Sequence, residues 1–316
     1  MKVLIIGGSG FLGLNLATSL VRRGYLFEGG RRRAIDEVLI FDLVRPSDPV
    51  PDGVRVVLGD VRDAVAISSL LTDDVTSVFY LASMMSAESE HRWDAAYDCN
   101  VSALRGVLNI FRERPAGRRF VFSSSVAALR RSVGAEAVRD PLTTYGTTKA
   151  MCELLIEDAS RMNIIDARVA RLPTVVVRPG SANRAASGFA SNIFRDCRGG
   201  RVPVVPVGVA HELLVIGVIA AVESMVMLHD VDRDSIGPRC TVNLRGITVS
   251  VNELLAEATR RYGSVAREAL ISVDPSVERI IGSWPVAWSD DGARSMGLPF
   301  DLSLRHIVDS YDGVAP

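Results

Sequence analysis

The eleven residues VLIIGGSGFLG, at positions 3–13, combine an apolar strand, a glycine-rich loop and the start of a helix. The apolar run 3–6 predicts a buried strand, and leucines spaced four residues apart predict a helix over 11–23. Between them, glycines at 7, 10 and 13 give the pattern G-x-x-G-x-x-G. Glycine lets the backbone turn tightly and lie against a pyrophosphate, and a helix N-terminus offers free N–H groups to that anion.

This strand–loop–helix context predicts dinucleotide binding, whereas an isolated glycine turn would be only structural. The residues expected to contact the cofactor here are Gly7, Ser9, Gly10, Phe11, Leu12 and Gly13. A second predicted strand ends at Asp42, whose carboxylate can accept hydrogen bonds from ribose hydroxyls and repel a 2′-phosphate. We therefore expect NAD, although Arg45 nearby leaves NADP open. Asp60 and Val61, after the third strand, suit the adenine edge; the alternative is an ordinary loop acid.

The first half of the chain alternates short apolar strands with helical patterns. Strands are predicted over 37–41, 54–58, 77–82 and 120–123, and helices over 94–114 and 145–162. Such strands between helices indicate a parallel sheet covered on both faces. We predict the α/β class, with a doubly wound, Rossmann-type sheet and a smaller C-terminal α/β substrate domain. We assign 1–175 to the NAD-binding domain and 176–316 to the substrate domain, from which some elements can return to the sheet.

Beyond residue 180 the predicted strands and helices become shorter. We expect a strand over 203–207, a helix over 214–228, a strand over 241–244 and helices over 249–262 and 302–311. In the first half, the Gly/Arg-rich segment 27–36 reads as a surface loop, and its three arginines as a solvated turn.

Composition excludes several classes of protein. The 316 residues are 48% hydrophobic and 23% charged, which suits a folded chain with a sizeable core. A net charge of −1 gives no case for a nucleic-acid or anionic-membrane partner. Four cysteines and four histidines lack metal-ligand spacing, so we expect no metal and free thiols in a reducing cytoplasm. The apolar stretch 213–222 is about half of the ~18 residues that a membrane span needs, and it predicts a buried helix.

Tyr145 and Lys149 are four residues apart, so on a helix they share one face. The chain has only one other lysine, Lys2, and uses arginine elsewhere, so Lys149 calls for a specific explanation. A predicted strand ends in three serines, of which Ser125 is the last. Tyrosine beside an ammonium can exchange a proton with a substrate hydroxyl, and a serine can orient that oxygen. The alternative is an ordinary amphipathic helix with a surface Tyr–Lys pair.

Taken in this order, GGSGFLG, Asp42, Asn100, FVFSSS and YGTTK resemble the extended short-chain dehydrogenase/reductase family of the NAD-dependent epimerase/dehydratase superfamily. The resemblance implies that Ser125, Tyr145 and Lys149 form a catalytic triad. It also implies that Asn100 anchors a water relay to the lysine, although a helix N-cap is an open alternative. Further cofactor contacts are expected at Leu81, Ala82, Ser83 and Leu172, and Tyr145 and Lys149 are expected to contact the cofactor as well. A homodimer through the helices 94–114 and 145–162 is implied as well.

Two later segments, RPGSANRAAS at 178–187 and GSWP at 282–285, resemble the D-erythronate dehydrogenase branch of that family. The resemblance implies NAD-dependent oxidation of the C2 hydroxyl of a small sugar acid to the 2-oxo acid. A sugar acid needs a cation for its carboxylate and hydrogen-bond partners for its hydroxyls. We nominate Arg178, Asn183 and Ser187, with Ser125, although Arg178 could instead pair with a core acid. Trp284 is expected to pack rather than to contact substrate.

Two other functions stay open. A nucleotide-sugar 4-epimerase would keep NAD tightly bound and return the hydride to its substrate. A non-catalytic NAD-binding sensor could use the same fold, because fold does not fix function.

Overall fold

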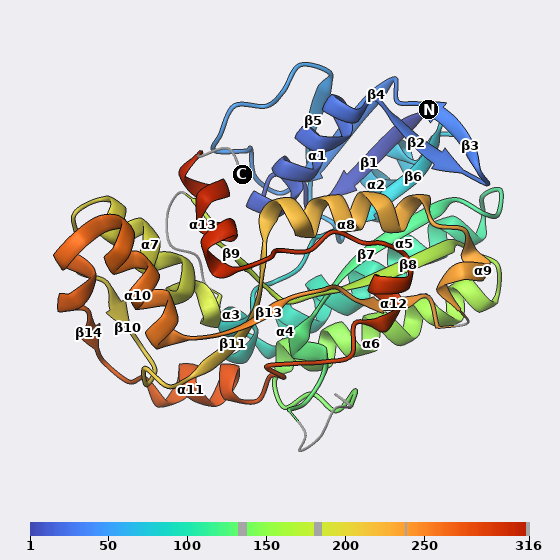
Figure 1. Ribbon diagram of the computed structural model, residues 1–316. Helices are drawn as coiled ribbons and strands as arrows, with labels where there is room; N and C mark the ends of the chain where they lie inside the picture. Colours follow the sequence, from blue (N-terminus) through green and yellow to red (C-terminus); the bar gives the residue numbers. More distant parts are fainter. Residues whose placement is uncertain (132–137, 180–184, 238, 314–316) are drawn as a thin grey trace.

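The computed structural model describes residues 1–131, 138–179, 185–237 and 239–313. In this described part the large sheet has seven parallel strands, ordered β12-β8-β7-β6-β1-β4-β5 (Figure 1). They are β1 (Lys2–Ile6), β4 (Glu37–Asp42), β5 (Val54–Leu58), β6 (Val75–Tyr80), β7 (Arg119–Ser125), β8 (Asp166–Leu172) and β12 (Thr241–Asn243). The chain builds β4 and β5 on one side of β1 and then crosses to β6 on the other. This switch point is where doubly wound folds bind ligands, and the predicted fold class is confirmed.

Helices cover both faces of this sheet, as the uninterrupted apolar strands predict. One face carries α1 (Phe11–Arg23) and α8 (Val218–Asp230); the other carries α2 (Ala64–Leu70), α5 (Ala103–Arg112) and α6 (Thr144–Arg161). Strand β1 shows why: Val3 and Ile5 belong to the core under α1 and α8. Leu4 and Ile6 belong to the core under the other three helices.

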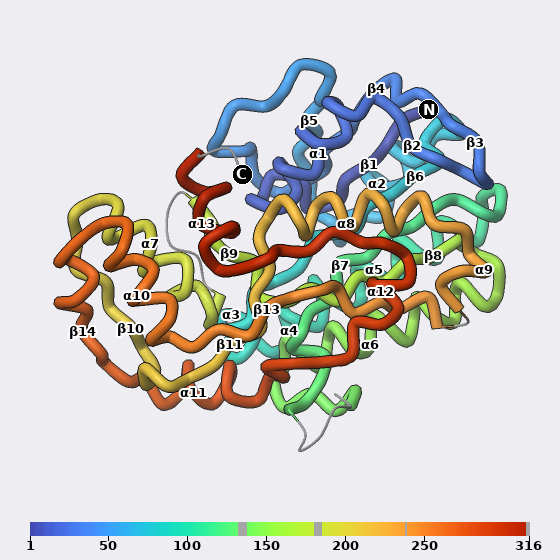
Figure 2. The backbone as a smooth tube through the Cα atoms, viewed as in Figure 1, coloured from blue at the N-terminus to red at the C-terminus, as the bar shows by residue number. Residues whose placement is uncertain are grey.

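A smaller layer lies beside the sheet (Figure 2). Its buried apolar side chains form a second core. In the described residues its three-stranded sheet has the order β13-β11-β9. Its elements are β9 (Thr174–Val176), α7 (Phe189–Arg198), β10 (Val204–Val205), β11 (Glu212–Gly217), β13 (Ile247–Ser250), α10 (Val251–Tyr262), β14 (Leu270–Ile271), α11 (Pro275–Gly282) and α13 (Leu304–Asp312). Although they come after residue 175, α8 and β12 pack with the large sheet, so the chain crosses between the two layers more than once.

The remaining short helical elements join the longer helices and strands. They are α3 (Ser86–His91), α4 (Trp93–Tyr97), the π-helical segment η1 (Asp98–Ser102), the 3-10 turns η2 (Val126–Ala128), η3 (Ala186–Gly188) and η4 (Gly263–Glu268), α9 (Arg233–Ile236) and α12 (Asp291–Ser295). The helix predicted over 94–114 is therefore divided into α4, η1 and α5.

The prediction of a surface loop over 27–36 is wrong. The segment forms an antiparallel hairpin of β2 (Tyr25–Glu28) and β3 (Arg31–Ala34). Gly29 and Gly30 turn the chain with φ of 55° and 73°, the left-handed conformation that a tight hairpin requires. The arginines of β3 are exposed, as expected for a solvated segment.

The prediction of a buried helix over 213–222 is wrong for the first half of that segment. Residues 212–217 are the strand β11, which pairs with β9 on one side and β13 on the other, and α8 begins only at Val218. An apolar run buried on both faces carries no periodicity that distinguishes strand from helix. Similarly, residues 247–250 form β13, so the helix predicted from 249 starts at Val251.

Three other properties concern the described residues as a set. None of their helices is both long and apolar enough to cross a membrane. They contain no group of three or more His, Cys, Asp or Glu side chains that could hold a metal ion. All four cysteines are free thiols.

Candidate active site

The glycine loop after β1 is shaped by close backbone packing. Gly7 has a φ of 82°, and a Cβ there would lie 2.4 Å from the backbone nitrogen of Ala82. A Cβ on Gly13 would lie 2.5 Å from the Cα of Gly8, so helix α1 could not pack against the loop with any larger residue. By contrast, nothing lies within 4 Å of the Cβ position of Gly10. The loop is therefore tight at its two ends and open at its middle, where an anion could meet the N-terminus of α1.

Asp42 lies at the end of β4 and faces this loop. Its Oδ2 accepts a hydrogen bond from the Ser9 backbone nitrogen at 2.9 Å, and its Oδ1 accepts one from the Val44 nitrogen at 3.3 Å. The hydroxyl of Ser9 is buried without a hydrogen-bond partner. An acceptor at the strand end, an unpartnered hydroxyl and the open space above Gly10 fit a dinucleotide with its ribose at Asp42 and its phosphates at the loop.

A cavity of about 690 Å³ runs from this loop along the carboxyl ends of the large sheet. All of the predicted cofactor residues line it: Gly7, Ser9, Gly10, Phe11, Leu12, Gly13, Asp42, Asp60, Val61, Leu81, Ala82, Ser83, Tyr145, Lys149 and Leu172. Asp60 is engaged by the Arg62 guanidinium and backbone nitrogen, and these hydrogen bonds lower the pKa of its carboxyl. Arg45 is exposed and does not line the cavity.

Helix α6 and strand β7 bring the predicted catalytic residues to the same cavity. Tyr145 lies in the first turn of α6, and Ser125 is the last residue of β7. Lys149 is 3% exposed, and its Nζ donates to the Ser123 carbonyl at 2.8 Å. That Nζ lies 5.7 Å from the centroid of the Tyr145 ring. Within the described residues no carboxylate pairs with the Lys149 ammonium, so a buried positive charge faces Tyr145 without a paired anion.

Gly146 lets α6 approach η2, the turn that directly follows β7, closely. A Cβ at this position would lie 2.1 Å from the Ala127 carbonyl oxygen, two residues after Ser125. The helix begins there because the Thr143 hydroxyl accepts a hydrogen bond from the Gly146 nitrogen at 3.1 Å. Position 146 must therefore be glycine if Tyr145 on α6 and Ser125 on β7 are to line the same cavity.

Asn100 lies in the π-helical segment, behind the cavity rather than on its wall. Its Oδ1 accepts from the Met84 nitrogen at 2.7 Å, and its Nδ2 donates to the Thr148 hydroxyl at 3.0 Å. Because Asn100 lies inside the continuous helical run 93–112 and its side chain accepts from a residue outside that run, the N-cap alternative is wrong. The amide links the chain after β6 to the residue before Lys149, and its role in a water relay stays a prediction.

Two of the residues nominated for the substrate lie where the second layer meets the cavity. Arg178 and Ser187 line it, whereas Asn183 lies outside the described residues. The Arg178 guanidinium is 5.7 Å from the Phe11 ring centroid, and burial lowers its pKa. In the described part of the chain no carboxylate forms an ion pair with Arg178. The described residues therefore do not support the alternative that Arg178 pairs with a core acid.

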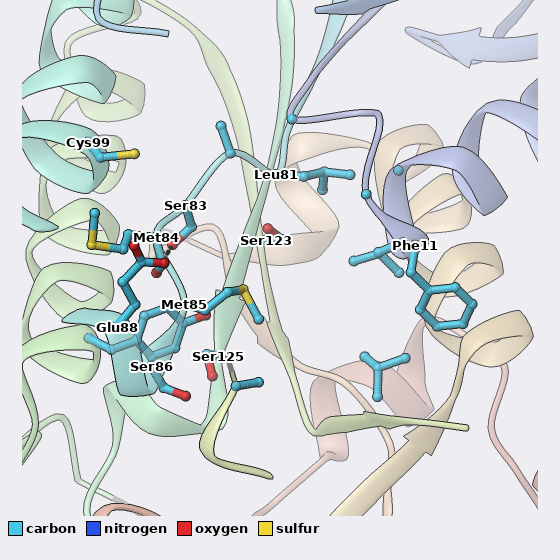
Figure 3. A pocket seen from close by; sticks show the side chains of 18 of the residues that line it. Phe11, Leu81, Ser83, Met84, Met85, Ser86, Glu88, Cys99, Ser123 and Ser125 are labelled. Carbon is cyan, nitrogen blue, oxygen red and sulfur yellow. Dashed lines mark hydrogen bonds between the residues drawn. The ribbon is translucent and has the colours of Figure 1, made fainter. Parts of the chain in front are cut away.

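Sequence reasoning missed one wall of the cavity. It is formed by Met84, Met85, Ser86 and Glu88, which follow β6 and enter α3. Figure 3 shows Phe11 on one side of the cavity and Ser86 and Glu88 on the other. The carboxyl ends of parallel strands meet at one edge of the sheet, where ligands bind. The place of these residues directly after β6 was therefore the sequence signal that could have identified them. Trp284, expected only to pack, is buried and also lines the cavity.

The sequence agrees with this geometry. The profile of the NAD dependent epimerase/dehydratase family matches residues 3–215. The chain belongs to this family. A nicotinamide cofactor is thereby implied, and the enzyme is an oxidoreductase of the extended short-chain dehydrogenase/reductase type.

Known relatives span nearly the whole chain. A D-erythronate dehydrogenase of Cupriavidus necator is 37% identical over 98% of both chains, and one of Haemophilus influenzae is 34% identical over the same shares. Among solved structures, a nucleoside-diphosphate-sugar epimerase from Agrobacterium tumefaciens is 28% identical, with a TM-score of 0.89 over 99% of this chain and 94% of its own. The resemblance to D-erythronate dehydrogenases thus extends through the second layer, which forms part of the cavity wall.

Proposed function

We propose that this enzyme is an NAD-dependent dehydrogenase that oxidises the C2 hydroxyl of a small sugar acid, resembling D-erythronate, to the 2-oxo acid. The observation that carries the proposal is the buried Lys149 ammonium, which has no carboxylate partner among the described residues and faces Tyr145 in a cavity beside the glycine loop. The two D-erythronate dehydrogenases, similar over nearly their full length, support the substrate class.

Each catalytic residue has a distinct task in this proposal. Tyr145, as phenolate, takes the proton of the substrate hydroxyl, and the Lys149 charge favours that phenolate. The Ser125 hydroxyl orients the substrate oxygen; it now accepts a hydrogen bond from the Ala127 nitrogen at 3.1 Å, which leaves its own proton to donate. Bound NAD supplies the hydride acceptor.

The preference for NAD over NADP rests on Asp42. Its carboxylate can accept from two ribose hydroxyls, and it would repel a phosphate on the 2′ oxygen. Arg45, the residue that left NADP open, is exposed and absent from the cavity lining. We therefore propose NAD as the cofactor used.

The substrate carboxylate is assigned to Arg178. A guanidinium that is desolvated, and that no described carboxylate neutralises, gains most by pairing with an incoming anion. Ser187 lines the same end of the cavity and can bond a substrate hydroxyl, and Asn183 is proposed for the same task.

A homodimer through the helices predicted over 94–114 and 145–162 is part of the proposal. Trp93, Met151 and Leu154 are exposed on α4 and α6, with exposed fractions of 57%, 38% and 54%. Burying such side chains against a second copy would be favourable. Light scattering on the wild-type chain and on Leu154→Glu tests it: a wild-type dimer that Leu154→Glu converts to a monomer is expected, and a wild-type monomer contradicts it.

The deciding assay is NADH formation with a panel of free four- and five-carbon aldonic acids. NADH that accumulates well beyond the enzyme concentration with one acid is expected. The similarity to a nucleoside-diphosphate-sugar epimerase structure makes a nucleotide-sugar epimerase the second candidate. That candidate predicts no NADH with any acid, NAD carried through purification, and turnover of a nucleotide sugar. NAD binding without turnover on either panel would indicate a non-catalytic sensor.

A further inference from the structure

A buried carboxylate lies directly behind the catalytic residues. Glu153 is on α6, one helical turn after Lys149, and is 0% exposed. The Ser124 hydroxyl donates to its Oε1 at 2.5 Å. Arg171 donates from Nε to Oε1 at 2.8 Å and from Nη2 to Oε2 at 2.6 Å, and Arg139 Nε lies 2.9 Å from Oε2. A carboxylate is kept in the interior only where such donors surround it.

These contacts connect the elements that carry the proposed chemistry. Ser124 lies between Ser123, whose carbonyl accepts a hydrogen bond from Lys149, and Ser125, which lines the cavity. Successive side chains of a strand point to opposite faces, so Ser124 turns toward α6 while Ser125 turns toward the cavity. Arg171 is the register partner of Ser124 on β8. One carboxylate thus fixes the axial position of α6 against the ends of β7 and β8.

We propose that Glu153 is a positioning residue that holds Lys149 and Tyr145 of α6 in line with Ser125 of β7. The inference rests on the proposed function, because it concerns the alignment of that triad. A displacement of about 1 Å between catalytic groups lowers turnover by as much as 10²-fold. The Glu153 charge also offsets the Arg139 and Arg171 guanidinium groups, so its loss leaves the helix that carries Tyr145 with more positive charge packed against it.

The test compares three substitutions. Glu153→Gln keeps the shape but removes the charge, and Ser124→Ala removes the link to β7 but keeps the charge. Glu157→Gln is the matched control, because Glu157 lies one turn further along α6 and also pairs with Arg139, at 2.6 Å, but has no contact with β7 in the described hydrogen bonds. Arg139 and Arg171 retain Glu157 and Asn243 as partners in Glu153→Gln, so the fold is expected to survive.

Kinetics give the first readout. In Glu153→Gln we expect kcat to fall about tenfold or more, with a smaller change in KM, and the acid limb of kcat/KM to move to lower pH. Ser124→Ala should lower kcat without moving the limb, and Glu157→Gln should change neither. A purely structural role would lower the active fraction and leave the limb in place. Wild-type kcat and an unmoved limb in Glu153→Gln, or equal effects in Glu157→Gln, would overturn the inference.

Amine labelling gives a readout that needs no activity. The chain has two lysines, the partly exposed Lys2 and the buried Lys149, so peptide mass spectrometry can report Lys149 labelling relative to Lys2. We expect a severalfold increase at Lys149 in Glu153→Gln and Ser124→Ala, and wild-type labelling in Glu157→Gln. Unchanged labelling in the first two variants contradicts the inference. If the wild-type enzyme reduces no NAD with any acid, the proposed function fails and the labelling still decides whether Glu153 positions Lys149.

Discussion

At the scale of the residue, the site depends on a few groups whose surroundings leave them one task. Lys149 is the clearest case: it is buried, it bonds only a backbone carbonyl among the contacts described, and it faces Tyr145. The sequence already singled it out, because a chain rich in arginine has just two lysines. What sequence could not show is that neither Lys149 nor Arg178 has a described carboxylate partner, because ion pairs depend on tertiary contacts.

Tyr145→Phe removes the proton acceptor and keeps the ring. We expect kcat to fall by about 10²–10⁴-fold, the range for losing a general base, while the Kd for NAD measured by calorimetry changes little. Full turnover in this variant would rule out the proposed role of Tyr145.

Arg178→Gln removes the cation proposed to bind the substrate carboxylate. Losing a charge-assisted pair of this kind costs about 1.5–3 kcal/mol, so KM for the acid should rise about 10- to 150-fold. Steady-state kinetics measure this, with KM for NAD as the internal control. If KM for NAD rises instead, Arg178 serves the cofactor and not the acid.

At the scale of the element, the arrangement of the site follows from close approaches that only glycine allows. Gly7 and Gly13 seat α1 on the loop, and Gly146 seats α6 on η2. The sequence predicted the strands and helices that carry these glycines, because the residues at which strands and helices begin and end are a local signal. It did not predict that β2 and β3 pair, although Gly29-Gly30 is a strong hairpin turn. Nor did it predict that β11 is a strand, because burial on both faces removes the periodicity.

Gly146→Ala would place a methyl group 2.1 Å from the Ala127 carbonyl oxygen. Overpacking of this kind costs about 1–3 kcal/mol, and relief by moving α6 away from β7 would separate Tyr145 from Ser125. We therefore expect a lower midpoint of urea unfolding and a loss of turnover in the folded fraction.

Gly106→Ala is the matched control for that substitution. Gly106 lies inside α5, and its Cβ position meets nothing within 4 Å. Alanine should stabilise the helix by up to about 1 kcal/mol and leave turnover unchanged. Equal effects at both glycines would mean that the contact with Ala127 does not decide the geometry.

At the scale of the whole molecule, the later half of the chain completes the layer that is built on the large sheet. Helix α8 covers the sheet beside α1, and its His229 reaches β6 at the edge opposite the cavity. There the Ser77 hydroxyl and His229 Nε2 are 2.7 Å apart, and Asp230 lies 3.0 Å from His229 Nδ1. From the sequence we expected that some elements after residue 175 can return to the sheet, but not which residues they would contact, because contacts between residues 152 positions apart leave no local pattern.

His229 should make stability depend on pH. Burial lowers its pKa below the ordinary value of 6.5, so the unfolded chain binds a proton at higher pH than the folded chain does. Stability is therefore complete above about pH 6.5 and falls as pH drops below it. Urea unfolding between pH 7.5 and 5 should show this fall, and His229→Gln should flatten it without changing turnover. An unchanged slope in the variant would assign the effect to other groups.

The most direct test of the central claim follows the hydrogen on C2 of the substrate. The wild-type enzyme is given NAD and D-erythronate deuterated at C2, and the NADH formed is analysed by mass spectrometry. The proposed dehydrogenase predicts NADH that accumulates and carries one deuterium from the substrate. Accumulated NADH without deuterium would contradict oxidation at C2, and no NADH from this acid or from the rest of the panel would contradict the sugar-acid dehydrogenase itself.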